Sequence, residues 1–237
     1  MTETGIYYPE HITTSQLDTI LERGWYRMGQ GVFTCDYIIK EEIYYRVYWL
    51  RYQLKNLSLG SSQQQIIKRN RRFSVYNKPF ELTEELEALY AAYKTGIDFD
   101  PSPSVRQWLF KDDLKNIFDT WLVEVRDSGR LIAAGVFDQG EESISGIMGF
   151  YHPEYKKYSL GKYLLLLKTI YAQDAGKKWY YPGYLVQGLP KFNYKLFLDE
   201  KATQVFLPEL NRWLPWKPEL TGVSDISSTE STPPAIS

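Results

Sequence analysis

Residues 156–161, with the sequence KKYSLG, combine groups that bind an anion. The two lysines bring positive charge, and a helical pattern of apolar residues follows at Tyr163, Leu166, Leu167, Ile170 and Tyr171. We expect this helix to begin at Ser159 and to end at Gly176. The first N–H groups of a helix are unpaired and lie at its positive end. Ser159 and Gly161 are therefore expected to offer backbone N–H groups to phosphate, whether or not Ser159 also caps the helix.

Residues 61–73, with the sequence SSQQQIIKRNRRF, form a second cationic segment. The pattern predicts a helix that is capped by Ser61. The densest positive charge of the chain lies here, at Lys68, Arg69, Arg71 and Arg72. Such a run either contacts a phosphate backbone, which makes binding sensitive to salt, or is only the solvated face of the helix.

The composition disfavours several other kinds of site. The 237 residues include one cysteine, Cys35, and two histidines, His11 and His152. A disulfide, a cysteine metal cluster and a Ser-His-Asp triad are therefore not expected. No apolar run is long enough to span a bilayer and no signal segment is visible, so we expect a cytoplasmic protein without a membrane partner, a metal or a cofactor.

The sequence also predicts the elements that must position these groups. Strand-like runs cover residues 121–126, 131–137, 143–150 and 179–186. The turn signal Asp127-Ser128-Gly129 joins the first two runs into a hairpin. The order strand, strand, strand, KKYSLG loop, helix, strand resembles the core of the N-acetyltransferase-like fold, in which the sheet opens at the loop. We therefore expect an α+β fold with a mixed, mostly antiparallel sheet that is flanked by helices.

The chain is expected to divide into three parts. A smaller N-terminal α/β lobe takes residues 1–75 and includes a strand over residues 43–52, with Arg46 and Arg51 on opposite faces. The transferase-type domain takes residues 76–220. Residues 221–237 are rich in Ser, Thr and Pro and are expected to be a disordered tail.

The donor loop departs from that of acetyltransferases. Their acetyl-CoA loop reads Arg/Gln-x-x-Gly-x-Gly/Ala, whereas the matching positions here hold Lys156, Ser159 and Gly161. Acetyl-CoA is therefore not the donor that we expect.

Four blocks of residues resemble the arginyl- and leucyl-tRNA-protein transferases in order and spacing, over about residues 24–197. They are Gly24-Trp25-Tyr26-Arg27 with Gly29; Arg51, Ser62-Gln63 and Lys68-Arg69-Asn70; Val136-Phe137-Asp138, Phe150-Tyr151, Pro153, Ser159-Leu160-Gly161 and Tyr163; and Gly183-Tyr184, Lys191 and Tyr194-Lys195. The N-terminal cysteines of that family are replaced by residues such as Tyr44 and Tyr45, which implies a metal-free member.

The resemblance implies transfer of arginine or leucine from charged tRNA to the N-terminal amine of proteins that begin with Asp or Glu, marking them for degradation. The partners are then aminoacyl-tRNA and the N-terminal peptide of the acceptor. Asp138 would hold an ammonium group, although it is equally a turn-initiating residue before Gln139-Gly140. Tyr194 and Lys195 would contact the terminal phosphate or polarise the ester carbonyl. Asp138, Tyr194 and Lys195 are thus the expected catalytic residues.

Substrate-binding roles under the same resemblance are assigned to Arg51, Tyr151, His152, Tyr184 and Lys191. A carboxylate on the acceptor calls for an Arg or Lys partner, and Arg46, Arg51 and Arg72 are unranked candidates. The cationic residues of 61–73, with Ser159 and Gly161, would hold the tRNA. Two alternatives stay open: an acyl-CoA-dependent N-acyltransferase on the same fold, and a non-catalytic binder of acidic N-termini.

Overall fold

The computed structural model describes residues 5–97, 101–111, 113 and 115–222. Residues 223–237, which make up most of the predicted tail, lie outside the described part. The strands are β1 (Gly5–Tyr7), β2 (Tyr26–Met28), β3 (Gly31–Thr34), β4 (Tyr37–Lys40), β5 (Ile43–Gln53), β6 (Ser74–Pro79), β7 (Thr120–Asp127), β8 (Arg130–Gln139), β9 (Ser143–Tyr151), β10 (Trp179–Val186), β11 (Thr203–Leu207) and β12 (Arg212–Pro215). The helices, with 3₁₀ helices labelled η, are α1 (Thr14–Glu22), η1 (Leu54–Asn56), α2 (Ser61–Asn70), α3 (Glu84–Lys94), α4 (Val105–Phe110), η2 (Pro153–Tyr158), α5 (Leu160–Asp174), η3 (Pro190–Phe197), η4 (Pro208–Leu210) and α6 (Pro218–Thr221).

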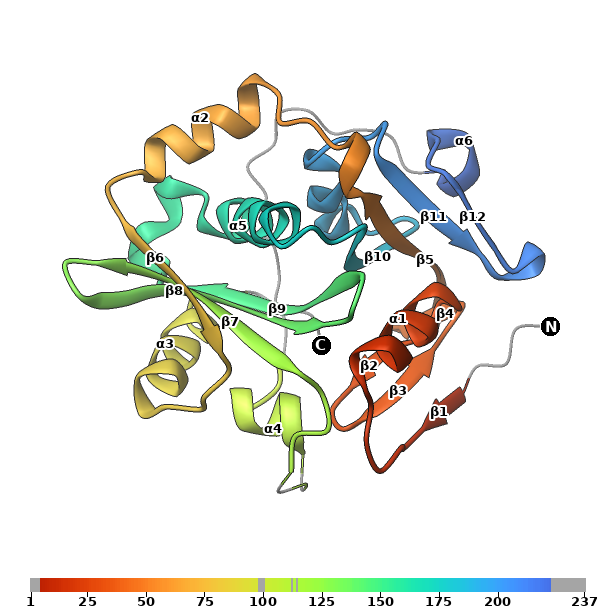
Figure 1. Ribbon diagram of the computed structural model, residues 1–237, viewed down its shortest axis with the longest axis horizontal. Helices are drawn as coiled ribbons and strands as arrows, with labels where there is room; N and C mark the ends of the chain where they lie inside the picture. The colour runs from red at the N-terminus through yellow and green to blue at the C-terminus, as the bar shows by residue number, and fades with distance from the viewer. Residues whose placement is uncertain (1–4, 98–100, 112, 114, 223–237) are drawn as a thin grey trace.

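A nine-stranded sheet forms the centre of the molecule (Figure 1). Its order is β12-β11-β5-β10-β9-β8-β7-β6, and β4 also pairs with β5. Only the β9–β10 pair is parallel among the described pairs of this sheet. The expected α+β fold with a mostly antiparallel sheet and flanking helices is therefore confirmed.

The β7–β8 hairpin shows why local signals predicted much of this sheet. Its turn residues Ser128 and Gly129 have φ of 50° and 90°. Positive φ at both positions matches the right-handed twist of the strands, and glycine adopts it without steric cost. The strands predicted over residues 43–52, 121–126, 131–137, 143–150 and 179–186 are all present.

Helices cover both faces of the sheet. Figure 1 shows α5 and α2 on one face and α3 and α4 on the other. Helix α5 follows Ser159 and ends just before Gly176, whose φ is 68°, as expected. The predicted N-cap of α2 is wrong, because Gly60 occupies that position and Ser61 is the first helical residue.

The buried face of α5 differs from the apolar stripe that the sequence predicted. Leu164, Leu165 and Lys168 are buried as well as Tyr163 and Leu166, whereas Leu167 and Tyr171 are only half-buried. A helix that packs against neighbours on several sides is apolar nearly all round. Helix α5 contacts β8 and β9 on one side and α2 and η3 on others, which explains the difference.

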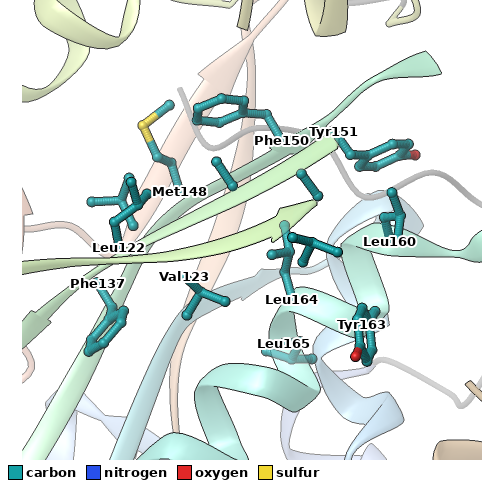
Figure 2. Close-up of a cluster of buried hydrophobic side chains, with 14 of the residues drawn as sticks. Leu122, Val123, Phe137, Met148, Phe150, Tyr151, Leu160, Tyr163, Leu164 and Leu165 are labelled. Carbon is teal, nitrogen blue, oxygen red and sulfur yellow. The ribbon is translucent and has the colours of Figure 1, made fainter. Parts of the chain in front are cut away.

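The main core lies between α5, α3 and strands β7, β8 and β9. Figure 2 shows Leu122 and Val123 from β7, Phe137 from β8 and Phe150 from β9 in this cluster, with Leu164 from α5. Each of these five side chains is almost fully buried. Burial of a large apolar side chain contributes about 1.5–3 kcal/mol, so this cluster fixes α5 on the sheet.

The N-terminal residues form a three-stranded sheet in the order β1-β3-β2, beside the central sheet. Strands from both sides of residue 75 nevertheless pair in the central sheet, because β5 lies between β10 and β11 and β6 pairs with β7. The division at residue 75 stays a prediction. None of the helices in the described ranges has the length and apolar character that crossing a membrane requires.

Candidate active site

The central sheet opens between β9 and β10. Their parallel pairing covers only residues 179–181 against 143–145, and it stops after the pair Tyr181 and Ser145. The next residue of β10, Pro182, has no N–H to donate, and Gly183 has φ of 100° next to a register shift. Strand β10 therefore continues alongside β5 while β9 diverges from it.

A cavity of about 370 Å³ lies on one side of this opening. Its lining has five aromatic residues, namely Tyr26, Phe33, Trp49, Trp108 and Tyr184, and the polar residues Ser102, Gln107, Lys111 and Ser145. Trp49 stacks on Tyr26 with ring centroids 3.7 Å apart and meets Tyr184 edge-on at 4.9 Å. No Asp or Glu lines the cavity among the described residues. The cavity therefore suits an apolar or aromatic group.

Arg27 lines the same cavity, but its guanidinium is committed to the protein. It donates to Asp138 Oδ1 at 2.8 Å, to Thr120 Oγ1 at 2.9 Å and to the backbone oxygens of Gly29 and Leu109. Asp138 is fully buried and Oδ2 of its carboxylate has no hydrogen-bond partner among the described residues. Burial raises the pKa of Asp138 above its ordinary value, against the opposing effect of Arg27.

A second, smaller cavity of about 30 Å³ lies on the α5 side of the opening. Gly146 and Ile147 of β9 line both cavities, so little more than these residues separates them. A Cβ atom on Gly146 would lie 3.0 Å from the Tyr180 hydroxyl and 3.3 Å from Lys168 Nζ. A side chain at this position would therefore press on these two polar groups, which would have to move by a few tenths of an ångström.

Lys195 is 1% exposed and lies beside the same opening. Its ammonium is 4.7 Å from the ring centroid of Tyr194, 5.1 Å from that of Phe192 and 5.8 Å from that of Tyr184. Burial, together with the nearby charge of Lys168, lowers the pKa of Lys195 from 10.5 to about 7. Burial lowers the pKa of Lys168 to about 8. Two amines that are partly neutral at physiological pH therefore flank the opening.

Some of the predicted site residues come together here. Tyr184 lines the large cavity, whereas Tyr194 and Gly161 line the small one, and Lys195 lies against both tyrosines. Burial raises the pKa of both tyrosines, that of Tyr184 to about 12, so their hydroxyls stay protonated. Asp138 lines neither cavity, since Arg27 lies in front of it.

Other predicted residues line neither cavity. The guanidinium carbon of Arg51 lies 3.7 Å from the ring centroid of Trp179 and 4.5 Å from that of Trp213. Tyr151 packs on Tyr93, and His152 contacts Arg130 at the far end of β9. Lys191 is half-buried at the start of η3, with its ammonium 5.2 Å from the Phe192 ring centroid.

The two cationic segments lie side by side. Arg69 donates to the backbone oxygen of Lys157 at 3.2 Å, and Asn70 donates to that of Tyr158 at 3.0 Å. The side chains of Lys68, Arg69, Arg71 and Arg72 are exposed. Ser159 precedes α5 with φ of 53°, and its side chain makes no capping hydrogen bond. One basic surface, made of the end of α2 and the loop before α5, thus borders the α5 side of the opening.

Several residues at the opening are not evident from the sequence. Lys168 falls within the apolar run of α5, and its position four residues after Leu164 is the signal that places it on a buried face. Tyr26 and Trp49 come from the N-terminal segments, more than a hundred residues before β10. In the part of the chain that the structure describes, no three His, Cys, Asp or Glu side chains are grouped to hold a metal ion.

Comparisons with known proteins agree on one family. A family model described as arginine-tRNA-protein transferase, C terminus, matches residues 85–202. The chain is 34% identical over 139 residues to the aspartate/glutamate leucyltransferase of Stutzerimonas stutzeri (strain A1501), covering 58% of this chain and 59% of that protein. The aspartate/glutamate leucyltransferase of Leptospira interrogans (serovar copenhageni) is 23% identical over 217 residues, covering 87% and 81%. The first match thus takes in less than two thirds of its relative's length.

Solved structures resemble this chain only distantly. The structure of L-PGS from Bacillus licheniformis superposes with a TM-score of 0.41 and 13% identity, over 59% of this chain and 46% of that one. A likeness at this level carries no argument about the fold or the site.

Proposed function

Since the chain belongs to the arginyl- and leucyl-tRNA-protein transferase family, we propose that it transfers an amino acid from charged tRNA to the N-terminal amine of proteins that begin with Asp or Glu. The names of the relatives favour leucine as that amino acid and acidic acceptors. The observation that carries the proposal is the opening between β9 and β10, which has a cavity on each side and lies within the matched residues. The proposed donor, charged tRNA, implies a cytoplasmic location.

We also propose an N-acetyltransferase-like arrangement of the sheet and separate roles for residues 1–75 and 76–220. An N-acetyltransferase-like arrangement is supported by the divergence of β9 and β10 next to the loop that enters α5. Residues 1–75 would serve as the lobe that closes the large cavity, since Tyr26, Phe33 and Trp49 line it. Residues 76–220 would carry the chemistry.

The large cavity fits a leucyl group better than an arginyl group. An arginine side chain brings a permanent positive charge, which is costly to bury without a carboxylate partner. The described residues that line the cavity include no Asp or Glu, and the carboxylate of Asp138 is already paired with Arg27. An apolar side chain can instead pack against Trp49 and Tyr184.

The reaction itself demands alignment and a neutral amine. The acceptor nitrogen attacks the ester carbonyl carbon, the new C–N bond forms, and the bond to the ribose oxygen breaks. Holding the two groups in place contributes roughly 7–11 kcal/mol in ideal cases. Lys195 in its neutral form would take a proton from the amine nitrogen as the new C–N bond forms and return it to the departing ribose oxygen.

The basic surface is proposed to bind the tRNA. The exposed residues Lys68, Arg69, Arg71 and Arg72 would neutralise backbone phosphates, and the loop at Ser159 and Gly161 would bind phosphates of the 3′ end. The surface borders the opening, so the ester at the tRNA end can reach the cavities. Among the predicted acceptor residues, Tyr184 lines the large cavity, whereas Arg51, Tyr151, His152 and Lys191 lie outside both described cavities.

Incubation with labelled leucyl- and arginyl-tRNA, and with peptides that begin with Asp, Glu or Ala, tests the proposal. We expect leucine on the Asp and Glu peptides and little on the Ala peptide. Binding of acidic peptides without any transfer would instead show a non-catalytic binder. Transfer from acyl-CoA alone would replace the proposed donor by a coenzyme.

A further inference from the structure

Lys168 is a second buried amine at the opening, and the reaction described above assigns it no part. It extends from α5 over the sheet, with its Nζ next to Gly146 of β9. Its ammonium is 6.0 Å from the ring centroid of Tyr180. Tyr194, which packs against the ammonium of Lys195, lines the same small cavity as Lys168. The two lysines therefore share one aromatic enclosure.

No acidic side chain balances the two charges within the described residues. Neither Lys168 nor Lys195 takes part in an ion pair there. The tyrosines beside the pair are Tyr180 and Tyr184 of β10, Tyr194 of η3 and Tyr52 of β5, whose hydroxyl donates to the backbone oxygen of Lys195. Burial raises the pKa of all four tyrosines, so they are uncharged near neutral pH. The nearest further cation of η3 is Lys191, whose ammonium lies 5.2 Å from the ring centroid of Phe192, which Lys195 also faces. The cationic side chains of α2, which packs on α5, are exposed to water.

In the free protein Lys168 has no such counter-charge among the described residues. Gly161 at the start of α5 lines the same cavity of about 30 Å³ as Lys168, so a tRNA phosphate bound there would balance the charge of Lys168 in the complex but not in the free protein. Two unbalanced charges in such an enclosure relieve each other most simply when one amine loses its proton.

We propose that Lys168 is a positioning residue that keeps Lys195 neutral by like-charge repulsion across the interface between α5 and η3. Repulsion between two ammonium groups in one buried enclosure lowers the pH at which the first of them loses its proton, by about one unit or more. Lys168, with a pKa of about 8, is still largely protonated when Lys195 titrates near pH 7, so its charge favours the neutral amine of Lys195 that can act as a base. The benefit for the rate rests on the proposed aminoacyl transfer, whereas the coupling between the lysines does not.

Carbon-13 NMR of lysine-labelled protein tests the coupling directly. The Cε resonance of Lys195, assigned with Lys195→Met, is followed against pH in the wild type and in Lys168→Met. We expect the Lys195 midpoint to rise by about one pH unit or more in Lys168→Met. Lys195→Met should leave the midpoint of Lys168 nearly unchanged, because Lys195 loses its proton near pH 7, before Lys168 titrates at about 8.

Three further variants separate charge from packing. Lys168→Gln also removes the charge, but its side chain differs in shape from that of methionine. It should reproduce the shift even where Lys168→Met folds poorly. Lys168→Arg retains the charge and should leave the Lys195 midpoint low. Lys40→Met removes an exposed charge at the β4–β5 turn and should change nothing at Lys195. Circular dichroism confirms that each variant is folded.

The outcomes are distinguishable from those of the transfer assay. An unchanged Lys195 midpoint in both neutral variants, or a wild-type midpoint near 10.5, would overturn the inference even if leucine transfer is observed. A shifted midpoint without transfer would support the coupling and count against the proposed function. Where transfer occurs, the acidic limb of kcat/KM should move to higher pH in Lys168→Gln by the same amount as the NMR midpoint.

Discussion

Arg27 Nη1 donates a hydrogen bond to Asp138 Oδ1 at 2.8 Å, and the two side chains are 1% and 0% exposed. The pair joins β2 to the end of β8 across 111 positions of sequence. Thr120 donates to the same carboxylate oxygen at 2.7 Å. The pair therefore ties the N-terminal residues to the central sheet behind the large cavity.

Removing one partner of this pair should destabilise the fold. Arg27→Met or Asp138→Asn leaves the other group buried with too few partners, and we expect a loss of roughly 3–5 kcal/mol in the free energy of unfolding. Urea denaturation measures the loss. The matched control is Arg46→Met, which breaks the exposed pair with Glu209 and should lose less than about 1 kcal/mol. Equal losses in the two variants would contradict a structural role for the pair.

Lys195 should make stability depend on pH. Its pKa is lowered from 10.5 in the unfolded chain to about 7 in the fold, so protonation below pH 7 opposes folding in full. This penalty fades as pH rises from 7 toward 10.5. Lys195→Met removes it and should be more stable than the wild type at pH 6, by a few kcal/mol at most, although it loses activity.

Thermal or urea unfolding at pH 6 and pH 9 measures that difference. We expect the advantage of Lys195→Met to be smaller at pH 9 than at pH 6, because the penalty decreases above pH 7 and is lost only near pH 10.5. A variant with the same advantage at both pH values would show that packing, and not protonation, governs the effect.

Gly146 should be intolerant of even one added methyl group. In Gly146→Ala the new Cβ meets the Tyr180 hydroxyl at 3.0 Å and Lys168 Nζ at 3.3 Å, so both groups must shift. We expect transfer to fall by roughly 10- to 100-fold, because small displacements at a reacting centre are costly. Gly149→Ala is the control on the same strand, since its Cβ meets only ordinary contact at 3.4 Å. Similar rates for the two variants would place the reaction elsewhere.

The end of α2 should supply the salt dependence of tRNA binding. Replacing Lys68, Arg69, Arg71 and Arg72 by Gln should weaken binding and lower the slope of log K against log salt, by roughly 0.7–0.9 for each phosphate that is no longer neutralised. Filter binding over a range of salt concentrations measures the slope. Gln at the exposed Arg23 and Lys40 is the control and should leave the slope unchanged. An unaltered slope in the first variant would show that these four side chains face the solvent and do not contact tRNA phosphates.

Local patterns predicted most elements of the fold. The turn residues Ser128 and Gly129 determine the β7–β8 hairpin, and Ser159 and Gly176 flank α5, because each signal acts within a few residues of the chain. The position of β5 between β10 and β11 could not be predicted in this way. Its partners lie more than a hundred residues further along, and alternation of side chains does not identify them.

The candidate site was predicted only in part for the same reason. Tyr184 lies in β10 and Lys195 in η3, the next element of the chain, so a resemblance in that segment was enough to mark them. The surroundings that change their chemistry come from distant segments, as with Lys168 on α5 and Arg27 beside Asp138. Burial of a charge depends on tertiary packing, which no single stretch of sequence specifies.

The most direct test of the account is mass spectrometry of a peptide that begins with Asp, after incubation with the protein, leucyl-tRNA and acetyl-CoA in one reaction. We predict a product that carries one added leucine on its N-terminal amine, with its amount reduced in Lys195→Met. An acetylated product, or an unmodified peptide in the presence of intact leucyl-tRNA, would contradict the proposed aminoacyl transfer.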